Sequence, residues 1–404
     1  MPIEAWSDPQ VTHTTEAVRG TWVRRLWSVL AVCVGCGLAH IGTSTMPFQI
    51  GALVDGSRRS ASQAGLFGFF QVGALALGMI LISGWMDRVP PRRIAMCGCL
   101  LALMANIGLY FALDFPLQVA FAVAAGLGYG FVFAATVAGA ASAAEPDRLY
   151  AIGNGGALLI VVGVMTALPP TQMRLGALGV FAALAALPIL CAPFLLGFAT
   201  GRRSQDIQLA AWRIPGAVGL LFAWGMFSAG TGALYAFSER IGTSIHLPPT
   251  QIALVLSSGV FVGVLGTVVA ALLGSRVNRP LALVLGLCGS GMACLLLGFA
   301  THLALYAAGV FVYWVFYMFL YSYLLGTAAV LDPTGRVGTL GGGLERLGYA
   351  LGAGAGGVLA GHATYSATGV LGFGGCVLGL VAGCPSLFRA LQAKRNDFPA
   401  GRKS

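Results

Sequence analysis

Charged residues are scarce in this sequence. They make up 9% of its 404 residues, whereas apolar residues make up 57%. Soluble domains average about 25% charged residues, so this composition excludes a fold surrounded by water. Long polar stretches are scarce too, because a near-continuous series of apolar segments runs from residue 26 to residue 388. Each segment approaches the roughly 20 residues that cross a bilayer as a helix. The sequence therefore predicts an integral membrane protein with many spans.

Residue clusters that hold metals or carry out catalysis are also lacking. The five histidines are scattered along the chain without the spacing of metal ligands. All nine cysteines fall inside predicted spans, and the Cys33–Cys36 pair has no second cluster, so we interpret the cysteines as packing residues. No loop is long enough for a catalytic domain. We expect no metal, no cofactor and no enzymatic activity.

Short polar gaps divide the apolar stretch into twelve predicted helices. Prolines mark several of the gaps, among them Pro90-Pro91, Pro169-Pro170 and Pro248-Pro249. The predicted helices are 26–53, 62–85, 93–113, 116–142, 149–169, 174–199, 214–239, 250–274, 280–301, 303–330, 337–361 and 365–388. The first 20 residues contain three acidic residues and no apolar stretch, so they do not resemble a cleavable signal peptide.

Basic residues give the predicted orientation. Placing the N-terminus in the cytoplasm puts 18 basic residues on that side and 4 on the other. Cytoplasmic loops of membrane proteins carry this excess, so both termini are predicted to be cytoplasmic, in a bacterial inner membrane. The net charge of +10 is then a topology signal, and we expect no nucleic acid partner.

The two halves of the chain are repeats of one another. The longest internal polar stretch, residues 200–213, lies at the centre and predicts a cytoplasmic linker between six-helix bundles 26–199 and 214–388, flanked by cytoplasmic tails 1–25 and 389–404. A shift of 188 residues without gaps aligns Gly42-Thr43 with Gly230-Thr231, Arg88-Val89 with Arg276-Val277, and Tyr129 with Tyr317. Parallel repeats of this kind build transporters whose substrate site lies between the repeats.

The loop Asp87-Arg88-Val89-Pro90-Pro91-Arg92-Arg93 resembles the signature loop of the major facilitator superfamily, with two prolines in place of its glycine. With the helix count and the repeat, the chain is identified as a member of that superfamily. The resemblance implies an all-α fold of twelve transmembrane helices in two pseudo-symmetric halves, acting as a monomer.

The resemblance further implies a cytoplasmic gate. Asp87 is expected to face the start of the eleventh helix, near Arg336 to Thr339, where a carboxylate would accept from unpaired N–H groups and meet the positive end of the helix dipole. The alternative is a solvated charge that only follows the topology rule. The predicted gate comprises Asp87, Arg88, Arg92, Arg93, Arg276 and Arg336.

Two features of proton-coupled drug exporters in the superfamily are missing. The fourth predicted helix has no arginine, and the fifth has no Gly-Pro pair. Both absences argue against a proton-coupled drug exporter.

Glu345 and Arg346 are the strongest candidates for a site. Ionisable residues at membrane depth cost roughly 2.5–3.5 kcal/mol on insertion scales and usually mark a pathway. Arg346 lies ten residues beyond Arg336, about 15 Å along a helix and therefore near mid-membrane. The first half has Ala157 and Leu158 at these positions, so the shared fold does not require the charges. Arg346 would bind a substrate carboxylate and Glu345 would carry a proton; alternatively, both are structural.

Further candidates come from other helices. His40 titrates in the range that suits proton coupling, and Thr43 to Pro47 after it predict a kinked, partly unwound helix. Gln71 and Asn154 are buried polar residues that either contact the substrate or join helices. Tyr313, Tyr317 and Tyr321 share one helix face, which would suit an aromatic substrate or represent ordinary ring packing.

The sequence predicts a carrier of a small organic anion such as a carboxylate, coupled to protons and working by alternating access. The tyrosines expected along its wall would suit an aromatic acid. One alternative is a proton antiporter that exports hydrophobic or drug-like compounds. Another, from a different class, is a membrane receptor that transports nothing. The predicted partners are a small solute, protons and the lipid bilayer.

Overall fold

The computed structural model describes residues 9–83, 88–141, 146–198, 213–274, 277–332, 336–362 and 364–397. The first half contains α1 (Pro9–Ser44), α2 (Met46–Ser57), α3 (Ala61–Ser83), α4 (Pro91–Phe111), α5 (Phe115–Ala141), α6 (Pro146–Leu175) and α7 (Gly179–Leu195). The second contains α8 (Ala217–Tyr235), α9 (Ser238–Ser244), α10 (Pro249–Leu273), α11 (Arg279–Gly298), α12 (Leu303–Leu331), α13 (Arg336–His362), α14 (Ser366–Leu378), the π-helical turn η2 (Gly379–Gly383) and α15 (Cys384–Asp397). Nearly all of the predicted linker 200–213 lies outside the described residues.

The helices make twelve membrane spans, as predicted. In the described part of the chain, ten helical segments are long and apolar enough to cross a bilayer. Helix α7, with 17 residues, and α13, which carries Glu345 and Arg346, complete the set. Large apolar side chains point outward from many spans, as lipid contact requires; they include Leu81, Leu100, Leu159, Leu190, Leu254 and Leu272.

The first span of each half is broken. In the first half the break is at Thr45, between α1 and α2, where Pro47 occupies the first turn of α2. The Thr45 amide and the Thr45 hydroxyl both donate to the Ile41 carbonyl (2.9 and 2.7 Å), which closes the last turn of α1 before the break. This agrees with the kink predicted after His40. In the second half, α8 and α9 are separated by Ala236 and Phe237.

The prediction that the fifth span ends at Pro169-Pro170 is wrong. Helix α6 continues through both prolines to Leu175. Membrane helices tolerate prolines within a span, and the Thr171 hydroxyl adds a hydrogen bond to the Ala167 carbonyl (2.8 Å) in the turn that contains both prolines. The turn comes instead at Gly176, whose φ of 80° suits glycine.

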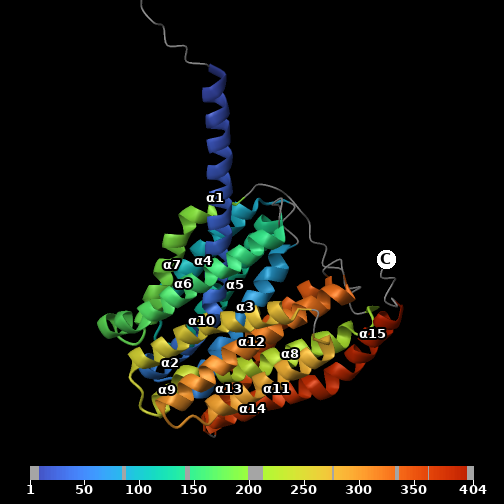
Figure 1. Cartoon of the computed structure of the whole chain (residues 1–404). Coiled ribbons are helices and arrows are strands. Elements are labelled where there is room, and N and C mark those ends of the chain that lie inside the picture. The colour runs from blue at the N-terminus through green and yellow to red at the C-terminus, as the bar shows by residue number, and fades with distance from the viewer. Residues whose placement is uncertain are drawn as a thin grey trace, which may run out of the picture.

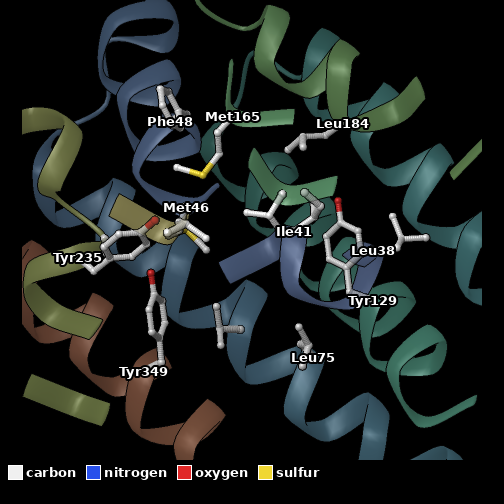
Figure 2. Close-up of a cluster of buried hydrophobic side chains, with 14 of the residues drawn as sticks. Leu38, Ile41, Met46, Phe48, Leu75, Tyr129, Met165, Leu184, Tyr235 and Tyr349 are labelled. Atoms are coloured by element: carbon white, nitrogen blue, oxygen red, sulfur yellow. The ribbon is translucent and has the colours of Figure 1, made fainter. Parts of the chain in front are cut away.

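The two halves are joined mainly on one side of the membrane. We call the side where α1 enters the bundle and α15 ends the terminal side, and the side where α2 and α9 lie the distal side (Figure 1). One apolar cluster contains residues of both halves, and its second-half members come from Leu234–Val260, Ala293–Trp314 and Tyr349–Ala353. Figure 2 shows Tyr235 and Tyr349 of the second half packed toward Met46 of the first within this cluster. A second cluster, on the terminal side, is formed among the described residues by second-half residues alone.

The space around the glycines of α3 and α13 also differs between the distal and terminal sides. On the distal side, a Cβ added to Gly65 of α3 would lie 2.6 Å from the Gly357 Cα of α13, so the two backbones touch. On the terminal side of α13, a Cβ at Gly342 or Gly343 would meet nothing within 4 Å. The distal side is therefore closed, while the terminal part of α13 faces open space.

Candidate functional site

Helix α13 directs two adjacent charged side chains toward different halves of the protein. Glu345 and Arg346 are 6% and 7% exposed. Glu345 accepts a hydrogen bond from the Tyr317 hydroxyl of α12 (2.8 Å), within its own half. Arg346 reaches across to His40 and Thr43 of α1, in the first half. The roughly 100° between neighbouring positions on a helix accounts for this divergence.

The contacts of Arg346 form the centre of the site. Its Nη1 donates to the Thr43 hydroxyl (3.2 Å), and its Nη2 lies 3.0 Å from Nδ1 of His40. The guanidinium also lies over the Phe133 ring of α5, 5.7 Å from its centroid. Asn154 of α6 lies within hydrogen-bonding reach of His40. Four helices thus hold one group of polar side chains around a cation buried between the halves.

The surroundings of Glu345 are aromatic. The Tyr317 ring stacks between Tyr313 (5.8 Å between centroids, 24° between planes) and Tyr321 (6.3 Å, 9°), which agrees with the shared face predicted for these residues. The Ser228 hydroxyl of α8 donates to the Glu345 carbonyl (2.6 Å) and fixes the backbone of α13 at this point. The tyrosine stack therefore forms the wall beside the carboxylate.

Two further tyrosines bridge the halves at the break between α1 and α2. The Tyr349 hydroxyl donates to the Thr43 carbonyl (3.3 Å), and the Tyr235 hydroxyl donates to the Ser44 carbonyl (3.1 Å). Both carbonyls lie where α1 ends, so their usual helical donors are displaced. The sequence analysis missed these tyrosines. Their only sequence signal is a hydroxyl on an otherwise apolar helix.

Gln71 lies in a different polar group from Arg346. Its amide nitrogen donates to Oε1 of Gln49 (2.9 Å), whose own amide donates to the Thr45 hydroxyl (3.0 Å). These three residues belong to the first half and join α2 to α3. Within the described residues the Gln71 Oε1 atom has no hydrogen-bond partner. Of the predicted site residues, the structure brings together Arg346, His40 and Asn154, and places Glu345 with the three tyrosines.

An ion-pair cluster that sequence analysis missed closes the distal side. Arg240 of α9 makes a two-pronged pair with Asp55 at the end of α2 (2.8 and 2.6 Å) and also donates to Glu239 (2.7 and 3.0 Å). Arg240 is 6% exposed, whereas Asp55 is 55% exposed. Asp55 and Arg240 come from different halves, so we call Asp55, Glu239 and Arg240 the distal latch.

The predicted cytoplasmic gate falls largely outside the described residues. Asp87, Arg276 and the side chain of Arg336 belong to the part that is not described, and Arg88, Arg92 and Arg93 are exposed. At the start of α13, Oδ2 of Asp332 accepts from the Val337 amide (3.3 Å) and so fills the capping role expected there. The contact between Asp87 and α13 stays a prediction.

Among the described residues, no group of three histidine, cysteine, aspartate or glutamate side chains lies close enough to hold a metal ion.

Comparisons with known proteins identify relatives by structure alone. No protein-family model and no curated sequence matches the chain. Among solved structures it resembles a mutant of the nucleoside transporter NupG (TM-score 0.71, 10% identity, 90% of this chain and 99% of the other). It also resembles a D-xylose–proton symporter, with a TM-score of 0.70 and 14% identity over 90% of this chain and 98% of the other. A third similar structure is a bacterial homologue of the human lysosomal transporter Spinster in an inward-facing and occupied conformation, with a TM-score of 0.67 and 17% identity over 94% of this chain and 98% of the other. At these identities the likeness concerns the fold, and it extends over nearly the whole of each chain.

Proposed function

We propose that this chain, which has the fold of the major facilitator transporters, carries a small organic anion together with protons by alternating access. The observation that carries the proposal is Arg346, a permanent cation buried between two repeated halves and bonded across them. A guanidinium binds a carboxylate through two parallel N–H donors, so this position suits an anionic group. The structural neighbours named as transporters, one of them a proton symporter, support transport as the activity.

The proposed working unit is a single chain, because both halves that surround Arg346 belong to it. With the predicted orientation the terminal side is cytoplasmic. The closed distal latch and the open terminal side of α13 then correspond to an inward-facing state. Release and uptake of solute at the cytoplasm would take place from this state, and opening of the distal side would complete the cycle.

A flux assay with matched variants tests the proposal. Purified protein is reconstituted into liposomes and uptake of radiolabelled monocarboxylates, such as benzoate and acetate, is measured with and without an inward proton gradient. Uptake by protein-free liposomes, which the neutral acids enter unaided, is subtracted. We expect gradient-driven uptake that Arg346→Gln abolishes. Arg279→Gln, which removes a cation at the start of α11 away from the group around Arg346, serves as the control and should retain uptake. Equal uptake by the Arg346→Gln variant would reject the proposal.

Export of hydrophobic cations is the second candidate. Glu345 supports it, because a buried carboxylate beside stacked tyrosines can bind a cation through charge and ring faces. In this case Glu345→Gln would abolish efflux of a lipophilic cationic dye, and monocarboxylate uptake would be absent from the wild-type protein.

A further inference from the structure

The contact between His40 and Arg346 depends on the protonation state of the histidine. Their nitrogens lie 3.0 Å apart. A guanidinium carries five N–H donors and no acceptor, so Nδ1 of His40 accepts this bond and carries no proton. A proton on Nδ1 would set two donors and two positive charges face to face. Protonation of His40 and the observed contact therefore exclude each other.

We infer that His40 is the proton-coupling residue of this site and that its protonation turns the His40–Arg346 pair into a receptor for a carboxylate. The inference rests on the proposed function. With Nδ1 protonated, Arg346 gives up its bond to the ring, and both groups donate to the same anion. One carboxylate oxygen faces the guanidinium and the other faces the imidazolium. Proton and anion then bind together, and their charges cancel when the pair crosses the membrane.

The surroundings of His40 fit this role. From the first half, Phe133 contacts the ring at 5.8 Å between centroids and Asn154 lies within hydrogen-bonding reach. Among the described residues, the titratable or charged groups around it are Cys36 on α1 itself, the Tyr129 ring of α5 beside Gly42, and Tyr349 and Arg346 on α13. The adjacent carboxylate, Glu345, bonds to Tyr317 of α12 instead of to His40.

The internal repeat indicates that the pair is not required by the fold. In the 188-residue register, His40 corresponds to Ser228 and Arg346 corresponds to Leu158. Ser228 donates to a backbone carbonyl, as a structural hydroxyl does. The same framework is therefore built in the other half without either ionisable group.

The test measures proton uptake during binding. Benzoate is added to purified full-length protein in weak buffer at about pH 7, where a carboxylic acid with a pKa of about 4 is fully ionised, and pH change and heat are recorded together. Benzamide, which has the same ring without the charge, is the control ligand. We expect the wild-type protein to take up close to one proton for each benzoate bound. Its affinity should fall as the pH rises above the titration range of histidine.

Two variants separate the coupling residues. His40→Gln keeps an acceptor for Arg346 but cannot be protonated, so benzoate should bind without proton uptake and with an affinity that no longer changes with pH. Glu345→Gln tests the other ionisable group of the site: whatever its effect on the affinity for benzoate, each benzoate that binds should still bring close to one proton with it. Loss of uptake in Glu345→Gln with retention in His40→Gln would overturn the inference, as would benzoate binding to the wild-type protein without uptake. The second of these results needs no folded His40 variant. If neither benzoate nor acetate binds the wild-type protein at any pH, the proposed function fails first and the inference with it.

Discussion

The contact between α3 and α13 gives the sharpest test of how the distal side opens. A Cβ added at Gly65 would lie 2.6 Å from the Gly357 Cα and 2.7 Å from the Ala353 carbonyl oxygen. Both atoms belong to backbone, so Gly65→Ala forces the two helices apart. Overpacking of this kind costs about 1–3 kcal/mol. If the helices separate when the distal side opens, the cost falls on the distal-closed state alone. The distal-open population should then rise by about 5- to 150-fold relative to the closed one.

Spin labels on opposite halves measure that population. Leu113 and Thr301 are exposed in distal loops at equivalent positions of the repeat, so cysteines there report the distance across the distal side. The native cysteines Cys97 and Cys288 are exposed and are first replaced by serine. Double electron–electron resonance should show a longer distance component that grows in the Gly65→Ala protein.

A matched glycine on the same helix provides the control. A Cβ added at Gly73 of α3 would meet nothing within 4 Å, so Gly73→Ala changes helix propensity equally without touching α13. Its distance distribution should match the wild-type one. If Gly65→Ala folds and gives that same distribution, the α3–α13 contact persists in every state that the protein visits, and the idea that the distal side parts there is refuted.

Three further predictions concern other contacts. Asp55→Asn should destabilise the distal-closed state by less than about 1 kcal/mol, and by less still at high salt, because the carboxylate is half exposed. The distal-open fraction should therefore rise only modestly. Arg240→Gln should open the distal side further, since Glu239, 13% exposed, loses its partner at a cost of about 2–5 kcal/mol; the same spin labels compare the two variants. Tyr129→Phe removes the oxygen that accepts from the Asn106 amide (3.0 Å) and should lower the free energy of unfolding by about 1 kcal/mol without changing flux, as thermal melting and transport assays would show.

The spans could be predicted from sequence because a bilayer imposes their length. A helix must supply about 20 apolar residues whatever its neighbours are, so composition alone locates it. The end of α6 could not be predicted in this way. A proline pair such as Pro169-Pro170 commonly ends a helix in water, but membrane helices tolerate prolines within a span, and α6 continues through both.

The sequence predicted individual polar residues of the candidate site but not which of them contact one another. Glu345 and Arg346 stand out against an apolar helix, and the structure shows both buried. Their partners depend on how the halves meet. Asp55 and Arg240 are 185 residues apart and each lies near a predicted turn, where a charge is unremarkable. The sequence gives no means of pairing them, since that contact exists only when the distal side is closed.

The two halves meet along two helix pairs that the repeat makes equivalent, α3 with α13 and α10 with α6. Helices α3 and α13 meet through Gly65 and Gly357, whereas the equivalent positions on α10 and α6 hold Ala253 and Pro169, which both carry side-chain atoms where the glycines have none. Separating bare backbones forfeits more dispersion contact than separating helices already spaced by side chains. Departure from the closed form should thus begin at the α6–α10 border and reach the α3–α13 border last.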